Sequence, residues 1–159
     1  MLLYYVIKKA DAGASIEETQ KYAEALKLNI DHQFTVDNLF HLKRGGRVSA
    51  TTAFVGTILK IKPTLHVDDS GKLTTTGKAM GRKNALRKLV DNMAETKDID
   101  DNDPIYISHA DCIEDAEYLK ELIAERFPNN EIYVNCIGPV IGCHAGCGTI
   151  AIFFKTKHR

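Results

Sequence analysis

Residues 138–149, GPVIGCHAGCGT, hold the residue types in this chain that are best suited to chemistry. Four glycines, one histidine, two cysteines and a threonine lie between two apolar runs, EIYVNCI and IAIFF. Three kinds of ligand are conceivable: a metal bound by the thiols, a phosphate bound by the backbone, or a carboxylate bound by His144. Each requires a different spacing.

The spacing is weak for a metal. Cys143 and Cys147 could supply ligands together with His144 between them, but a closed structural zinc site needs four ligands. The two other cysteines, Cys112 and Cys136, fall at a predicted helix start and in a predicted strand, so they do not form a second ligand pair. A metal at Cys143, His144 and Cys147 therefore stays a minor alternative.

The same segment does not fit a phosphate loop or a thiol enzyme. A P-loop places lysine after its second glycine, and neither Gly142 nor Gly146 is followed by one. Cys143 and His144 are adjacent, and neighbours in a strand-like stretch point to opposite sides, so a nucleophile–base pair is disfavoured. What remains is a loop framed by Gly142, Gly146 and Gly148.

That loop would hold His144 at the carboxyl end of a strand, where open α/β sheets place ligands. Glycine allows a ligand or another backbone segment to approach closely, and histidine can donate a hydrogen bond to a carboxylate near neutral pH. The other interpretation is a tight turn whose histidine is satisfied by the backbone. The residues alone do not separate these two readings.

A second polar segment, HLKRGGRVSATT at residues 41–52, could bind an anion. A helix beginning near Ser49 would present free backbone N–H groups, with Arg44 and Arg47 close by. The structural alternative is equally simple, because cations in the last turn of a helix complement its dipole and Ser49 is an ordinary N-cap.

Composition limits the class of protein. The chain has 159 residues, of which 44% are hydrophobic and 26% charged, which fits a globular domain with a sizeable core. Basic and acidic side chains number 21 each, so neither nucleic acid nor an acidic membrane surface is an expected partner. The apolar opening MLLYYVI is too short for a signal peptide or a membrane span, so we expect a cytoplasmic protein with reduced cysteines.

Hydrophobic periodicity and turn residues predict a mixed α/β order of elements. The expected helices occupy residues 2–12, 15–28, 37–42, 49–61, 82–95 and 112–127, and the expected strands occupy residues 30–36, 62–67, 72–79, 103–110, 131–137 and 149–157. Ser15 with Glu18, Asp37 and Asp111 are the expected helix N-caps. The threonine-rich hairpin supplies antiparallel pairing and the helix-linked strands supply parallel pairing, so the sheet should be mixed.

Five stretches in this order also resemble a known family. FTVDNLFHLKRGGRVS, ILKIKPTLHVDDSGKL, GRKNALRKLV, YISHADC and IGPVIGCHAGCGTIAIFF are similar to the C-terminal portion of the DegV family. These are bacterial fatty-acid-binding proteins, and some act as the lipid-presenting subunit of fatty-acid kinase. The resemblance covers nearly the whole chain.

The resemblance implies a two-layer mixed-sheet domain over residues 37–159, preceded at residues 1–36 by the tail of a truncated N-terminal region. It implies no catalysis by this chain and no cofactor or metal. The expected ligand is a long-chain fatty acid, and the expected protein partner is a fatty-acid kinase. Because the family's N-terminal domain has no counterpart here, we expect a C-terminal piece of a longer protein, which could be inactive alone or self-associate through its uncovered face.

The resemblance also assigns residues. The carboxylate-binding residues are His144, Arg44 and Arg82, and the ligand loop carries Gly142, Gly146 and Gly148. The apolar helix after Ser49 becomes a wall of the acyl tunnel, and the residues implied to line it are Ala53, Phe54, Val55, Ile58 and Leu59.

Overall fold

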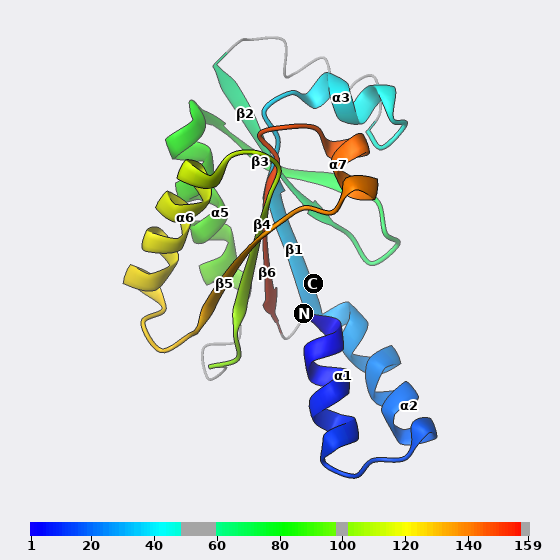
Figure 1. The fold of residues 1–159 in the computed structure, drawn as a ribbon. Coiled ribbons are helices and arrows are strands. Elements are labelled where there is room, and N and C mark those ends of the chain that lie inside the picture. Colours follow the sequence, from blue (N-terminus) through cyan, green and yellow to red (C-terminus); the bar gives the residue numbers. More distant parts are fainter. Residues whose placement is uncertain (49–59, 98–101, 157–159) are drawn as a thin grey trace.

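The computed structural model describes residues 1–48, 60–97 and 102–156, and these form a layered α/β structure (Figure 1). The helices are α1 (Leu2–Asp11), α2 (Ile16–Leu26), α3 (Leu39–Arg44), α5 (Arg82–Thr96), α6 (Ile113–Arg126) and α7 (Pro139–Ala145), with a short 3-10 turn at Lys27–Asn29. The strands are β1 (Ile30–Thr35), β2 (Ile61–Val67), β3 (Leu73–Met80), β4 (Ile105–His109), β5 (Ile132–Cys136) and β6 (Ile150–Lys155).

The strands of the described residues form one six-stranded sheet in the order β3-β2-β1-β6-β4-β5. β4 and β5 are parallel, while the other neighbouring pairs are antiparallel. The mixed sheet expected from the sequence is therefore confirmed. β1, which precedes the domain boundary expected at residue 36, lies inside this sheet between β2 and β6.

Helices α5 and α6 cover one face of the sheet, while α3 and α7 lie on the other face near one end of the strands (Figure 1). The larger core fills the space beneath α5 and α6, and it contains Leu86, Leu89, Met93, Ile107, Ile152 and Phe154. The inward face of α5 is therefore the one that its 3.6-residue period predicts. Helices α1 and α2 pack on each other and project beyond the sheet.

Strand alternation decides what each face of β1 presents. Gln33 points toward α5, where Asn92 donates a hydrogen bond to its side chain over 3.4 Å. His32 and Phe34, one residue to either side, must then point to the opposite face, because successive side chains of a strand alternate. That opposite face carries the site described below.

Two of the expected helix caps are wrong and one is confirmed. Ser15 and Glu18 form the predicted capping box at α2. The N-cap of α3 is Asn38 rather than Asp37, and its side chain accepts a hydrogen bond from the Phe40 backbone N–H. The N-cap of α6 is Cys112 rather than Asp111, because Asp111 has a φ of 53° and turns the chain before the helix begins.

Candidate functional site

A cavity of about 730 Å³ lies on the sheet face that carries α3 and α7. Its size falls in the range of roughly 300–1,000 Å³ that is usual for small-molecule sites. Most of the lining is apolar and includes Phe34, Leu42, Val67, Leu73, Val140 and Ile141. The polar side chains in the lining include Arg47, Lys72, Ser108, His144 and Thr149.

The cavity crosses the sheet from one edge to the other. Each strand contributes at least one lining residue, and representatives in sheet order are Leu73, Val67, Phe34, Ala151, Ser108 and Cys136. Since neighbouring strands lie about 4.8 Å apart, six strands span roughly 24 Å. The cavity is therefore long and mostly apolar, with a few polar groups at its walls.

The glycine-rich segment that supplies His144 is not the loop expected from the sequence. Residues Pro139–Ala145 form the short helix α7, with Gly138 as N-cap and Pro139 in its first turn. Proline suits that position because the first helical N–H groups have no partner within the helix. Cys143 and His144 therefore lie on a helix, and the strand-like geometry used against them as a pair does not apply.

Contacts with α3 hold the end of α7 in place. His41 Nε2 lies 2.7 Å from the carbonyl oxygen of Cys143, one of the last four carbonyls of α7, which lack helical partners. Thr149 is buried and donates a hydrogen bond to the Ala145 carbonyl oxygen over 2.9 Å. Two side chains from outside α7 thus satisfy its C-terminal end.

Two glycines after α7 permit this approach. Gly146 and Gly148 have φ values of 82° and 77°, which side-chain-bearing residues rarely adopt. A Cβ atom at Gly146 would lie 3.0 Å from the ring of His41, and one at Gly148 would lie 2.6 Å from Cβ of Asp37. These two members of the expected ligand loop serve close packing against α3 and the segment before it. By contrast, a Cβ at Gly142 would meet no atom within 4 Å.

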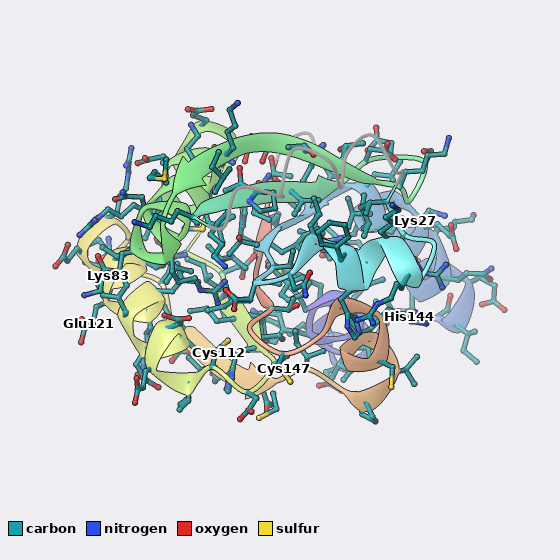
Figure 2. All side chains as sticks on the ribbon, turned by 90° about the horizontal axis from the view of Figure 1, so that it is seen from above. Lys27, Lys83, Cys112, Glu121, His144 and Cys147 are labelled. Atoms are coloured by element: carbon teal, nitrogen blue, oxygen red, sulfur yellow. The ribbon has the colours of Figure 1, made fainter. Side chains whose placement is uncertain are left out.

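His144 lies between α3 and α7, where it faces the C-terminal end of α3 (Figure 2). A Cβ atom at Gly45, the C-cap of α3, would be 3.2 Å from Nδ1 of His144. The missing side chain at Gly45 therefore makes room for the imidazole at the cavity wall. An imidazole in this position can donate a hydrogen bond to an anionic group in the cavity.

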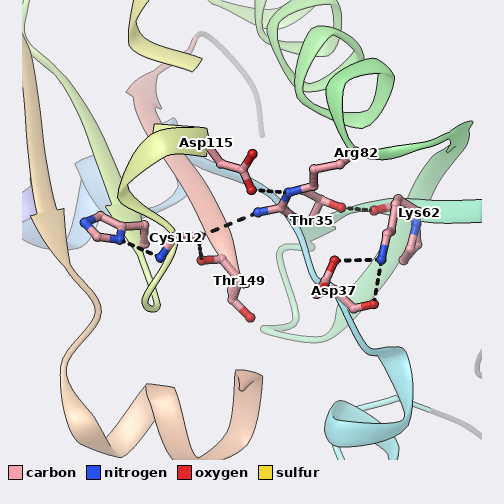
Figure 3. A network of polar contacts seen from close by, with 9 residues as sticks. Thr35, Asp37, Lys62, Arg82, Cys112, Asp115 and Thr149 are labelled. Carbon is pink, nitrogen blue, oxygen red and sulfur yellow. Dashed lines mark hydrogen bonds and ion pairs between the residues drawn. The ribbon is translucent and has the colours of Figure 1, made fainter. Parts of the chain in front are cut away.

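An ion pair connects the start of α3 to the sheet. Lys62 on β2 donates hydrogen bonds to Asp37, at 2.6 Å to Oδ1 and 3.0 Å to the backbone oxygen (Figure 3). The Asp37 side chain is 57% exposed, so this pair contributes little to stability, on the order of 0.5 kcal/mol. Its effect is geometric, since it fixes the segment that Gly148 approaches.

The candidate arginines lie in different places: Arg44, Arg47 and Arg82. Arg47 lines the cavity, whereas the family resemblance implied Arg44 from the same turn. Arg44 is exposed and outside the cavity lining, and its Nη2 lies 3.4 Å from Nδ1 of His41, the residue that contacts the end of α7. Sequence spacing alone could not say which arginine of the turn after α3 lies at the cavity wall.

Arg82 lies at the start of α5, away from the cavity lining. Its Nε donates to Asp115 Oδ2 over 2.7 Å, and its Nη2 lies 3.7 Å from Sγ of Cys112 (Figure 3). Burial raises the pKa of the Cys112 thiol, while the nearby Arg82 charge opposes that rise. The structure thus places His144 and Arg47 at one cavity and Arg82 in a separate network.

Within residues 1–48, 60–97 and 102–156, no three His, Cys, Asp or Glu side chains gather in a way that could hold a metal ion. Cys143 and Cys147 are both exposed. The described helices also include none that is long and apolar enough to cross a bilayer. The expected tunnel residues Ala53, Phe54, Val55, Ile58 and Leu59 lie outside the described residues.

Polar residues that sequence reasoning missed are Ser108, Thr149 and Lys72. Ser108 is one residue before the end of β4, and Thr149 directly precedes β6, so both lie where strands end beside the cavity. Lys72 comes from the β2–β3 turn. The rule that ligands bind beyond the carboxyl ends of strands could have identified Ser108.

Fold and cavity together define the class: an α/β binding domain with a long apolar cavity and polar groups at its wall. The family model described as an uncharacterised protein of the DegV family matches residues 1–157. The chain belongs to the DegV family, as the five sequence stretches predicted.

Individual relatives agree with this assignment. A DegV domain-containing protein of Clostridium perfringens is 46% identical over 155 residues, which are 97% of this chain and 53% of the relative. The chain spans about half the length of the curated relatives it matches.

Solved structures show the same fold. The fatty acid binding DegV family protein of Streptococcus agalactiae superposes with a TM-score of 0.82 at 28% identity, over 99% of this chain and 55% of that one. The Fatty Acid Kinase (Fak) B3 protein of Streptococcus pneumoniae, loaded with linoleic acid, gives a TM-score of 0.88 at 20% identity, over 98% of this chain and 55% of that one. At that identity the second likeness concerns the fold.

Proposed function

We propose that this chain supplies part of a binding site for a long-chain fatty acid, and that the apolar cavity receives the acyl chain. The observation that carries the proposal is the pairing of His144 with an apolar space that crosses six strands. A fatty acid combines one anionic head with a long apolar tail. The polar side chains at the cavity wall suit the head, and the apolar cavity suits the tail.

The acyl chain supplies most of the affinity in this proposal. Burying a methylene group contributes about 0.8 kcal/mol of transfer free energy, so a tail of sixteen or so carbons offers on the order of 10 kcal/mol before the costs of binding. The polar groups orient the head. A hydrogen bond to a charged group contributes about 1.5–3 kcal/mol, which is the share assigned to His144.

Two cationic side chains, Arg47 and Lys72, lie in the cavity lining. Both carry positive charge at neutral pH, which favours a carboxylate at the mouth over a neutral head group. Arg44 acts indirectly in this proposal, since it contacts His41 rather than the cavity. Arg82 keeps its expected role near the carboxylate only if its bond to Asp115 is exchanged on binding.

The intact protein would present the bound carboxylate to a fatty-acid kinase, with no catalysis by this chain. Support comes from the family resemblance and from three exposed cations at the end of α3 and in the turn after it, of which Arg47 lines the cavity: Lys43, Arg44 and Arg47. A kinase that acts on the acyl carboxylate needs that group at an accessible edge. The proposal predicts that charge reversal at Arg44 lowers phosphorylation by the kinase more than it lowers acid binding.

Mass spectrometry of lipid extracted from the purified protein tests the proposal. A long-chain fatty acid should co-purify in roughly stoichiometric amount, and it should be displaced by an added labelled acid. A protein that is consistently empty, and that takes up no added acid, would contradict the proposal.

A further inference from the structure

A second hollow of about 580 Å³ adjoins the cavity on the side of α1 and α2. The two spaces share three lining residues, His32, Gly71 and Phe153. Of these shared residues, Gly71 lies in the β2–β3 turn, whereas His32 and Phe153 lie on β1 and β6 of the sheet.

His32 and Phe153 face each other across the β1–β6 pair. They are register partners, and their rings lie 5.3 Å apart at an interplanar angle of 69°. Phe34 and Ala151 form the next pair on the same face toward α7, and Ile30 and Lys155 form the next pair toward α1. The two rings thus form a ridge between one side-chain layer and the next.

The walls differ in chemistry on the two sides of this ridge. On the α7 side the neighbouring lining includes Phe34, Val67 and Leu73. Beyond the ridge the lining includes the polar side chains of Lys27, Asp69 and Ser70 together with apolar Leu28 and Ile30. Burying the terminal methyl group of an acyl chain among the apolar side chains on the α7 side is favourable. Burying it beside the polar side chains beyond the ridge is less favourable, because those groups lose water.

We propose that the His32–Phe153 pair is the boundary of the acyl compartment and limits the length of acyl chain that the site accepts. This inference rests on the proposed fatty-acid function. The compartment on the α7 side already has a volume suited to a whole ligand, so a chain that fits it need not enter the second hollow. Phe153 has the larger side chain of the two, so we expect it to set the length limit.

Changing the size of residue 153 should move the limit in both directions. In Phe153→Ala the two spaces join, and an acyl chain that was too long gains access to Leu28 and Ile30. Each further methylene buried there raises affinity up to about fourfold, the factor that corresponds to 0.8 kcal/mol. In Phe153→Trp the larger side chain shortens the acyl compartment, and the highest affinity moves to shorter acids.

The experiment measures the affinity of the purified protein for saturated fatty acids from twelve to twenty carbons. The readout is the ratio of affinities for a long and a short acid within one variant, which cancels any general loss from the missing ring. Phe40→Ala is the matched control, because Phe40 is 42% exposed and belongs to neither lining. Phe153→Leu replaces Phe153→Ala if thermal unfolding shows that the alanine variant is not folded.

The expected result is a long-to-short ratio that rises at least tenfold in Phe153→Ala or Phe153→Leu, falls in Phe153→Trp, and stays unchanged in Phe40→Ala. Ratios within twofold of the wild type in both the enlarging and the narrowing variants would overturn the inference while leaving fatty-acid binding intact. Failure of the wild type to bind any acid of the series would overturn the proposed function, and this inference with it.

Discussion

The imidazole of His41 on α3 and the backbone carbonyl of Cys143 on α7 are joined by a hydrogen bond of 2.7 Å. A carbonyl oxygen can only accept, so Nε2 of His41 carries the proton. In a neutral ring Nδ1 is then an acceptor, and Arg44 Nη2 lies 3.4 Å from it. The bond connects the two helices that cover the cavity, one residue away from His144.

Removing this bond should loosen α7. We expect His41→Leu to lower the free energy of unfolding by about 0.5–1.5 kcal/mol, the net contribution of one hydrogen bond, because the Cys143 carbonyl loses its partner. Fatty-acid affinity should fall with it, since α7 carries His144. Urea unfolding and acid titration check both effects, and Lys43→Ala on the exposed side of α3 is the control. Wild-type stability in His41→Leu would show that the bond does not position α7.

The space beside Gly45 can be tested without straining the backbone. Gly45 has a φ of −75°, which any residue adopts, but its Cβ would crowd Nδ1 of His144 at 3.2 Å. We expect Gly45→Ala to keep near-wild-type stability and to weaken acid binding by up to about 10–100-fold, the value of one charge-assisted hydrogen bond. Isothermal titration measures the loss.

Gly46 is the matched comparison for Gly45. Its φ is 68°, and a Cβ there would meet nothing within 4 Å. Gly46→Ala should therefore cost about 1–2 kcal/mol of stability through backbone strain while displacing no side chain. Thermal unfolding measures this loss, and wild-type stability in Gly46→Ala would contradict the strain assigned to its backbone.

The glycines around α7 should respond in a fixed order. Gly148→Ala combines a φ of 77° with a 2.6 Å approach to Asp37, and Gly146→Ala combines 82° with a 3.0 Å approach to His41. We expect losses above the 1–2 kcal/mol of strain alone, largest at Gly148. Gly142→Ala lies inside α7 with open space and should raise stability by up to about 1 kcal/mol. Thermal unfolding ranks the three, and equal losses would contradict the packing assigned here.

The four cysteines should differ in their reaction with iodoacetamide. The thiolate is the reactive form, and burial raises the pKa of the Cys112 thiol, so less thiolate is present there at neutral pH. Cys136, Cys143 and Cys147 are exposed. Peptide mapping after brief labelling at pH 7.5 should find Cys112 least modified, and raising the pH should increase its labelling. Preferential labelling of Cys112 would show that its surroundings activate the thiol.

Much of the fold could be predicted because long periodic segments carry their own signal. The inward face of α5 follows from Leu86, Leu89 and Met93, and the capping box of α2 follows from Ser15 and Glu18. The helix α7 could not be predicted in the same way. It has only seven residues and contains an internal glycine, so the isolated segment has little tendency to form a helix.

What stabilises α7 comes from distant parts of the chain. His41 and Thr149 satisfy its last carbonyls, and neither pairing is visible in the local sequence. The candidate site shows the same division. The family resemblance predicted His144 as a site residue, and the structure places it in the cavity lining, whereas the position of Arg47 rather than Arg44 at the cavity depends on how the turn after α3 folds.

Comparison of a fatty acid with its methyl ester tests the central claim most directly. In the wild type the acid should bind more tightly than the ester of the same chain, because His144 donates to the carboxylate. In His144→Ala the affinity for the acid should fall about 10–100-fold while that for the ester changes little. Equal losses for acid and ester, or no loss for either, would contradict the role of His144 as the carboxylate-binding residue.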